Sequence, residues 1–200
     1  MNNILPKEIE KVISLFKELP GIGRRGAERI VFSLLKWPPE KLKFFGEELA
    51  ALTVNVKRCK VCCNLSEHET CKICSDGGRD ESLLCIVEDF IQLPVIEAAS
   101  YRGKYHILGG KLSPLEGITP DKLKIDLLQK RLSENKNIKE VLIALSQDIE
   151  GQATTVYLSK ILAIYGVKIT TLARGIPAGA DISFANSATL SAAIQGRVSV

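Results

Sequence analysis

Residues 59–74 read CKVCCNLSEHETCKIC, and this stretch decides how the chain is organised. It holds two CxxC pairs, Cys59 with Cys62 and Cys71 with Cys74, separated by eight residues. Two thiolates of one tight turn can reach the same tetrahedral ion, so the pairs together predict a site for one structural Zn²⁺ per chain. Such a site contributes on the order of 10–16 kcal/mol to folding. The competing interpretation is a set of redox-active dithiols.

The rest of this stretch leaves the ligand set open. Cys63 could replace Cys62, because CxxxC spacing is also permitted, and His68 could displace one thiolate. Cys85 lies in an apolar run and is expected to be a small buried hydrophobe. Residues 57–82 contain too little aliphatic side chain to bury a core of their own, so we expect the metal to organise them as a small module.

Upstream of the cysteines, residues 1–56 are predicted to form an all-helical domain. Apolar residues recur every three or four positions up to Pro20 and again from Arg24 to Lys36, and a third helix is expected from Pro39 to about Val56. The turn between the first two helices contains Gly21 and Gly23, whose backbone could approach a phosphate. Three basic side chains follow this turn directly: Arg24, Arg25 and Arg29.

The charge of the chain is unevenly distributed. Residues 1–60 hold 12 Lys and Arg against 7 Asp and Glu, whereas residues 61–200 hold 15 against 16. A basic N-terminal third favours an anionic partner such as nucleic acid. A solvated basic helical surface explains the charge equally well, and a Gly-containing turn can be a plain interhelical connection.

Downstream of the cysteines, residues 83–174 alternate short aliphatic runs with helical stretches. The runs at residues 83–88, 105–108, 141–145 and 167–172 are separated by helical patterns near 91–99, 121–134 and 151–165. This alternation predicts an α/β domain with a largely parallel sheet. Residues 175–200, with a further helical pattern at 187–195, form a C-terminal segment.

Acidic residues follow two of the predicted strands. Glu88 and Asp89 end the first, and Asp148 and Glu150 follow the strand at 141–145. Ligands of parallel α/β sheets bind at the carboxyl ends of strands, where these carboxylates could hold Mg²⁺. They could equally be loop acids that complement helix N-termini, and the residues alone do not decide between the two.

Composition narrows the class of protein. The 200 residues are 46% hydrophobic, enough for a globular core, but no apolar stretch approaches the roughly 18 residues that a membrane span needs. The N-terminus has no basic region followed by an apolar one, so a secretory signal is not expected and the cytoplasm is the default location. Reduced or metal-bound cysteines agree with that location.

Taken together and in order, these features resemble the RecR family of bacterial recombination mediators. The family's order is a helix-hairpin-helix, a four-cysteine zinc motif, a Toprim α/β domain and a C-terminal segment. In this chain they correspond to residues 19–29, 59–74, 86 to about 174, and 175–197. The resemblance places the family's basic positions on Arg25 and Arg29, and its Toprim glutamate on Glu88.

The resemblance implies a DNA-binding repair mediator rather than an enzyme. Such a protein would act with RecO-type and RecF-type partners to load RecA on gapped or SSB-coated DNA, as a ring-like homotetramer that binds duplex and single-stranded DNA. Toprim enzymes carry an Asp-x-Asp-x-Glu-Gly-Glu motif, and the matching stretch here begins with Ser146 and ends with Gln152. Losing two carboxylates predicts a site without catalytic residues that contacts a partner or binds Mg²⁺ weakly. A Mg²⁺-dependent nuclease or primase-like enzyme, and a zinc-stabilised protein-interaction module, are the alternatives.

Overall fold

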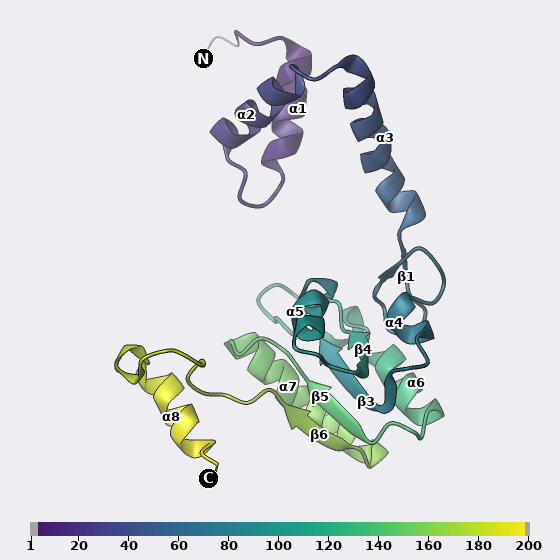
Figure 1. Cartoon of the computed structure of the whole chain (residues 1–200), viewed down its shortest axis with the longest axis vertical. Coiled ribbons are helices and arrows are strands. Elements are labelled where there is room, and N and C mark those ends of the chain that lie inside the picture. Colours follow the sequence, from purple (N-terminus) through teal and green to yellow (C-terminus); the bar gives the residue numbers. More distant parts are fainter. Residues whose placement is uncertain (1–3, 199–200) are drawn as a thin grey trace. The chain divides into compact units, whose positions relative to one another are not determined.

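The computed structural model describes residues 4–198 and divides into two compact units between Asn55 and Val56 (Figure 1). The ends of the predicted helical domain and C-terminal segment, residues 1–3 and 199–200, lie outside the described residues. Within residues 4–198, no helix combines the length and apolarity needed to cross a membrane.

The N-terminal unit is helical, as predicted. It consists of α1 (Lys7–Lys17), α2 (Arg24–Leu34) and α3 (Pro39–Asn55). The first two helices form a hairpin around a small core of Ile13, Ala27 and Val31, flanked by half-buried apolar side chains. Gly21 turns the chain between them with φ +78°, a left-handed conformation that strains other residues.

The second unit contains a four-stranded parallel sheet, which confirms the predicted α/β fold. Its strands are β3 (Asp80–Val87), β4 (Gly103–Ile107), β5 (Glu140–Ile143) and β6 (Lys168–Thr171), in the order β4-β3-β5-β6. All three neighbouring pairs are parallel. The carboxyl ends of the four strands therefore meet at one edge of the sheet.

The two faces of the sheet are covered differently. On one face, Leu84, Ile86, Val141 and Ile143 pack in a core with side chains of α6 (Ile125–Glu134) and α7 (Ile149–Leu162). The opposite face holds Cys85, Val87 and Tyr105, which pack against the short helices η1 (Phe90–Gln92) and α5 (Leu93–Ala98). Because alternate residues of a strand point to opposite faces, β3 is buried on both sides.

The cysteine stretch also covers this second face. It contains the antiparallel pair β1 (Lys57–Arg58) and β2 (Leu65–Ser66), followed by α4 (Lys72–Ser75). Cys63 is buried in the same core as Cys85, and Ile73 packs against that core. The N–H of Ile107 donates to the carbonyl of Cys62 at 2.9 Å, joining β4 to the first CxxC turn. The cysteine module is therefore part of the α/β unit.

The remaining elements are connections and the C-terminal segment. The turns η2 (Pro120–Lys122) and η3 (Ala163–Tyr165) lead into α6 and out of α7. The C-terminal segment contains η4 (Ile182–Phe184) and α8 (Ser187–Gln195), a helix that matches the predicted pattern at 187–195. Asn186 caps α8 by accepting a hydrogen bond from the N–H of Thr189 at 2.8 Å.

An ion pair links α5 to the start of β3. The Arg79 guanidinium lies against both carboxylate oxygens of Glu97, and the Tyr105 hydroxyl donates to Glu97 Oε1 at 2.6 Å. The Arg79 side chain is only 10% exposed, so this pair is shielded more than a surface pair. The hydrogen bond from Arg79 is the main reason that the pKa of Glu97 lies below its ordinary value.

We therefore predict that Glu97→Gln lowers the free energy of unfolding at pH 7 by about 1.5–3 kcal/mol, the range for hydrogen bonds to charged groups. A carboxylate with a lowered folded pKa stabilises the protein above its unfolded pKa, about 4.3, and the contribution disappears as pH falls through the folded value. Urea unfolding followed by circular dichroism should show the two proteins converging below about pH 4. Glu134→Gln, which breaks the exposed pair with Lys130, is the matched control and should change stability by less than about 1 kcal/mol.

Candidate functional site

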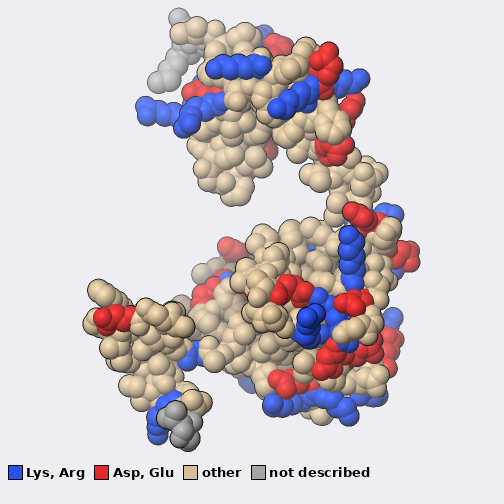
Figure 2. Space-filling view, in the orientation of Figure 1, with Lys and Arg blue, Asp and Glu red and all other residues tan. Residues whose placement is uncertain are grey.

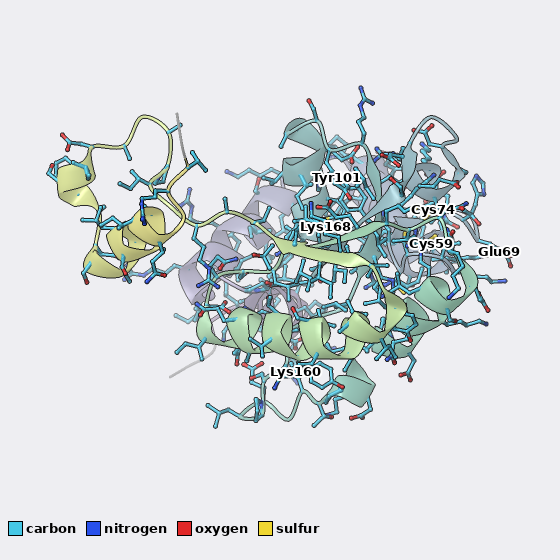
Figure 3. The ribbon with its side chains drawn as sticks, turned by 90° about the horizontal axis from the view of Figure 1, so that it is seen from below. Cys59, Glu69, Cys74, Tyr101, Lys160 and Lys168 are labelled. Carbon is cyan, nitrogen blue, oxygen red and sulfur yellow. The ribbon has the colours of Figure 1, made fainter. Side chains whose placement is uncertain are left out.

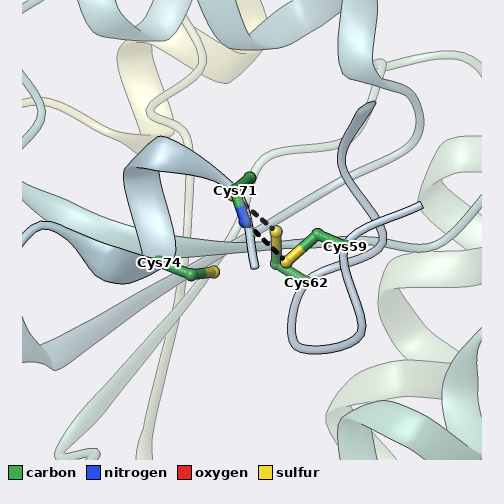
Figure 4. A group of neighbouring side chains, drawn as sticks. All are labelled: Cys59, Cys62, Cys71 and Cys74. Carbon is green, nitrogen blue, oxygen red and sulfur yellow. Dashed lines mark hydrogen bonds between the residues drawn. The ribbon is translucent and has the colours of Figure 1, made fainter. Parts of the chain in front are cut away.

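The two CxxC pairs converge on one point (Figure 4). The sulfur atoms of Cys59, Cys62, Cys71 and Cys74 all lie within 4.8 Å of one another, and three of these cysteines are buried. A tetrahedral zinc–thiolate centre with bonds of about 2.3 Å places its sulfurs about 3.8 Å apart. The distance between Cys62 Sγ and Cys71 Sγ, 3.5 Å, is close to that spacing.

Backbone hydrogen bonds hold the first CxxC turn in shape. The N–H of Cys63 donates to the carbonyl of Cys59 at 3.0 Å, and the N–H of Cys59 donates to the carbonyl of Asn64 at 2.7 Å. The N–H of Cys71 donates to Cys59 Sγ at 3.3 Å, which ties the second CxxC pair to the first. Cys71 stands directly before α4, so that helix carries Cys74 into the cluster.

The close spacing of the four thiol groups favours the binding of a cation between them. The hydrogen bond between Cys62 and Cys71 lowers the pKa of Cys71 and raises that of Cys62, because a shared proton stabilises one thiolate at the expense of the other. A divalent ion with four thiolate ligands would replace this shared proton, since a coordinating thiol is deprotonated by the metal. The donor set and its spacing fit a structural Zn²⁺ with no position left for a water molecule.

The structure places the two other candidate ligands elsewhere. Cys63 adopts a left-handed conformation, φ +65°, and its side chain is buried in the core on the second face of the sheet. His68 is exposed, and its N–H donates to Ser66 Oγ at 3.1 Å. Cys85 is fully buried in β3, as predicted. Among the described residues, the metal-binding group contains only the four cysteines of the CxxC pairs.

A buried lysine attaches the second CxxC turn to the sheet. Lys104 of β4 is 5% exposed, and its ammonium donates to the carbonyls of Ile73, Cys74 and Asp76 at 3.2, 3.1 and 2.6 Å. These carbonyls belong to α4 and to the residue after it, where a cation also complements the helix dipole. In Figure 3, Cys59 and Cys74 lie inside the module, with Glu69 towards its outer side.

The carboxyl edge of the sheet brings together two of the four predicted acids. Glu88, at the end of β3, accepts a short hydrogen bond from the N–H of Ser146. Asp148 caps α7 by accepting from the N–H of Gly151 at 2.7 Å. The Lys111 ammonium contacts Asp148 Oδ2 directly and lies 3.9 Å from Glu88 Oε2. A Cβ at Gly151 would lie 2.0 Å from the Ser146 carbonyl, so this tight turn requires glycine.

The other two acids have different surroundings. Asp89 forms a capping box at η1, where it accepts from the N–H of Ile91 at 3.2 Å. Glu150 is half-buried in the first turn of α7 and adds to the charge that raises the pKa of Lys111, although the largest cause is the hydrogen bond to Asp148. The helix-capping interpretation therefore describes Asp89 and Asp148. Glu88 and Asp148 also share a contact with Lys111.

The turn of the N-terminal unit presents its predicted residues to solvent. Gly21, Gly23, Arg24, Arg25 and Arg29 are all exposed. Gly23 is the N-cap of α2 and offers no side-chain cap, and the first turn of α2 contains no acid. Arg24 is shared between Glu10 at 3.0 Å and Glu28 at 2.8 Å. Figure 2 shows both basic and acidic side chains on the visible face of this unit, so charge density on that face does not by itself mark a site.

Comparison with known proteins identifies the family. Family models described as RecR helix-hairpin-helix, RecR four-cysteine zinc finger and RecR C-terminal match residues 9–52, 56–76 and 175–198, and a Toprim domain model matches residues 82–173. The Recombination protein RecR of Syntrophotalea carbinolica is 43% identical over 188 residues, 94% of each chain. The chain belongs to the RecR family. Proteins of the same name from Endomicrobium trichonymphae and Bacteroides thetaiotaomicron are each 42% identical, over 96% and 98% of this chain and 97% of their own length.

Sequence reasoning missed two lysines. The structure places one at the cysteine module and the other at the carboxyl edge of the sheet. Lys104 sits inside a buried strand, and only the position of α4 explains its burial. Lys111 left a detectable signal, because it follows Gly109 and Gly110 directly after β4 and so falls at the same sheet edge as Glu88.

For the metal centre we predict that wild-type protein carries one Zn²⁺ per chain and that Cys74→Ser loses it, because three thiolates leave the tetrahedron open. Cys63→Ser should retain full zinc and lose only about 1–3 kcal/mol of stability from a buried hydroxyl. Elemental analysis of the purified proteins measures both contents. Undiminished zinc in the Cys74 variant, or zinc loss in the Cys63 variant, would contradict the ligand assignment.

Proposed function

We propose that this chain is a DNA-binding recombination mediator that contacts the phosphate backbone through its N-terminal helical unit. The observation that carries the proposal is the match of successive segments to three RecR models and a Toprim model, including a helix-hairpin-helix whose second helix bears the exposed Arg25 and Arg29. Phosphate contacts position a protein on DNA without reading its sequence. We therefore expect affinity that depends on salt and is similar across sequences.

The geometry of the turn supports Arg25 and Arg29 as the main phosphate contacts. Both are exposed, and neither forms an ion pair within residues 4–198. They lie four residues apart on α2, which places them on the same side of the helix. The adjacent N-terminus of α2, without an acid or a side-chain cap, leaves its amides available to a phosphate. Arg24 contributes charge beside them while it is held by Glu10 and Glu28.

The same proposal assigns the Toprim edge a non-catalytic role. Ser146 and Gln152 stand where Toprim enzymes have carboxylates, and the Gln152 amide donates to the carbonyl of Gln147 at 2.8 Å. The Tyr105 hydroxyl is committed to Glu97, and burial raises the pKa of Tyr105, so this tyrosine is a poor nucleophile. Glu88, Asp89, Asp148 and Glu150 then serve as a surface for a partner.

We further propose the partners and assembly that the family resemblance implies. The chain would act with RecO and RecF in the cytoplasm to promote RecA loading on gapped or SSB-coated single-stranded DNA. It would do so as a ring-like homotetramer. A ring suits a unit with few phosphate contacts per chain, because repeated weak contacts gain from effective concentration.

The double variant Arg25→Ala/Arg29→Ala tests the DNA contact. We expect a large loss of affinity for gapped and duplex DNA, and a salt dependence whose slope falls by about 1 for each lost phosphate contact. Fluorescence anisotropy across a salt series measures both quantities. Zinc content and oligomer mass should not change, since these side chains lie outside the core and the metal site.

The matched control is Lys41→Ala/Lys43→Ala in the same unit. It removes the same charge from α3, where Lys41 lies 4.1 Å from the centroid of the Trp37 ring and Lys43 lies 3.8 Å from Glu47. We expect a much smaller loss of affinity from this control. Equal losses from the two double variants would mean that net charge, and not the turn, determines binding.

The alternative of a Toprim nuclease is tested by catalysis itself. Wild-type protein incubated with supercoiled DNA and Mg²⁺ should leave the DNA intact on agarose gels, and Glu88→Gln should give the same result. Mg²⁺-dependent nicking by the wild type that disappears in Glu88→Gln would replace the mediator proposal with an enzymatic one.

A further inference from the structure

Lys111 joins the two inner carboxylates of the Toprim edge. Each of these carboxylates uses one oxygen for a backbone N–H, Ser146 for Glu88 and Gly151 for Asp148. The other oxygen of each, Glu88 Oε2 and Asp148 Oδ2, faces the same Lys111 ammonium. The Lys111 ammonium therefore occupies the position beside the two carboxylate oxygens that a bound metal ion would use.

The backbone fixes Lys111 in this position. The N–H of Leu112 donates to Thr154 Oγ1 of α7 at 2.9 Å, which attaches the loop after β4 to the helix that Asp148 caps. Thr154 is fully buried, and the Lys111 side chain is 19% exposed. A lysine whose neighbouring backbone is held in place and whose side chain is largely enclosed loses less conformational entropy on forming an ion pair than a surface lysine does.

A divalent ion and this ammonium compete for the same oxygens. Mg²⁺ is usually bound through one or two carboxylates and several waters, so Glu88 and Asp148 would be a sufficient pair of ligands. Bringing a second cation to them would repel Lys111 and break its contacts. We propose that Lys111 is a built-in cation that takes the place of the divalent metal at this Toprim edge, so that the edge stays folded and metal-free in Mg²⁺.

This inference deepens the proposed non-catalytic role and rests on it, but the two are measured separately. Metal binding is read by spectroscopy and catalysis by DNA nicking. The edge also remains acidic when Lys111 is present, because Asp89 and Glu150 add negative charge nearby. Every variant therefore attracts cations at long range. A difference in metal binding between variants then reports whether the Lys111 ammonium occupies the place beside Glu88 and Asp148.

The experiment titrates zinc-loaded full-length protein with Mn²⁺, a spectroscopic substitute for Mg²⁺, and counts bound ions by electron paramagnetic resonance. Lys111→Met should gain one saturable Mn²⁺ site per chain that Mg²⁺ displaces, whereas the wild type shows none above background. Lys168→Met sets the background: it breaks a lysine–carboxylate contact of 3.2 Å between the first residue of β6 and Glu140, the first residue of β5, at the amino ends of these strands.

Three further variants locate the gained site. Lys111→Met/Asp148→Asn should return to background, because the amide keeps the helix cap and loses the metal ligand. Lys111→Arg should also remain at background, since it keeps the positive charge. If Lys111→Met fails to fold by circular dichroism, Lys111→Gln repeats the titration with a hydrogen-bond donor for Asp148.

Two results would overturn the proposal. The first is a wild-type Mn²⁺ site that Asp148→Asn abolishes, which needs no lysine variant to be informative. The second is a folded Lys111→Met or Lys111→Gln protein that binds no more Mn²⁺ than Lys168→Met. Nicking by a wild type that shows no such site would instead contradict the non-catalytic role and leave the metal assignment standing.

Discussion

The α/β unit depends on covering the second face of its parallel sheet. β3 is buried on both sides, but α5 and η1 are short, and the cysteine module completes the cover with Cys63 and Ile73. Lys104 and the hydrogen bond between Ile107 and Cys62 fix the module to β4. A loop with so little apolar content can pack against a sheet only if something else holds its shape. The four converging thiolates and their zinc supply that restraint, and so couple the metal to the core of the α/β unit.

The same unit balances charge at the carboxyl edge of its sheet. Carboxylates at the ends of parallel strands repel each other, and Toprim enzymes offset this with metal ions. In this chain the inner pair, Glu88 and Asp148, is offset by backbone N–H groups and by Lys111. Under the proposed non-catalytic role, the fold of the domain is kept without the arrangement of free carboxylates that metal-assisted chemistry needs. A partner protein that meets this edge would meet a partly neutralised surface.

The proposed DNA contact and the Toprim edge belong to different units of the chain, and this separation fits the proposed role of a mediator. Within residues 4–55, the N-terminal unit has a core of only three buried apolar residues, and α3 buries none of its own. Several of its apolar side chains are exposed instead, among them Leu35, Phe44 and Leu52. A small helical unit of this kind gains most from repetition in an assembly, where weak phosphate contacts act together.

The sequence alone determined the elements and the paired cysteine motifs that depend on local spacing. The helix periods before Pro39, the alternation of runs after Leu83 and the paired CxxC motifs are local patterns, and the structure has the corresponding helices, strands and cysteine cluster. Tertiary structure decided what local patterns do not encode: that Cys63 turns into the core, that Lys104 reaches the carbonyls of α4, and that Lys111 meets Glu88 and Asp148. Such contacts join residues far apart along the chain, 28 positions for Lys104 with Asp76 and 37 for Lys111 with Asp148. Their energies therefore depend on which strands lie side by side in the sheet.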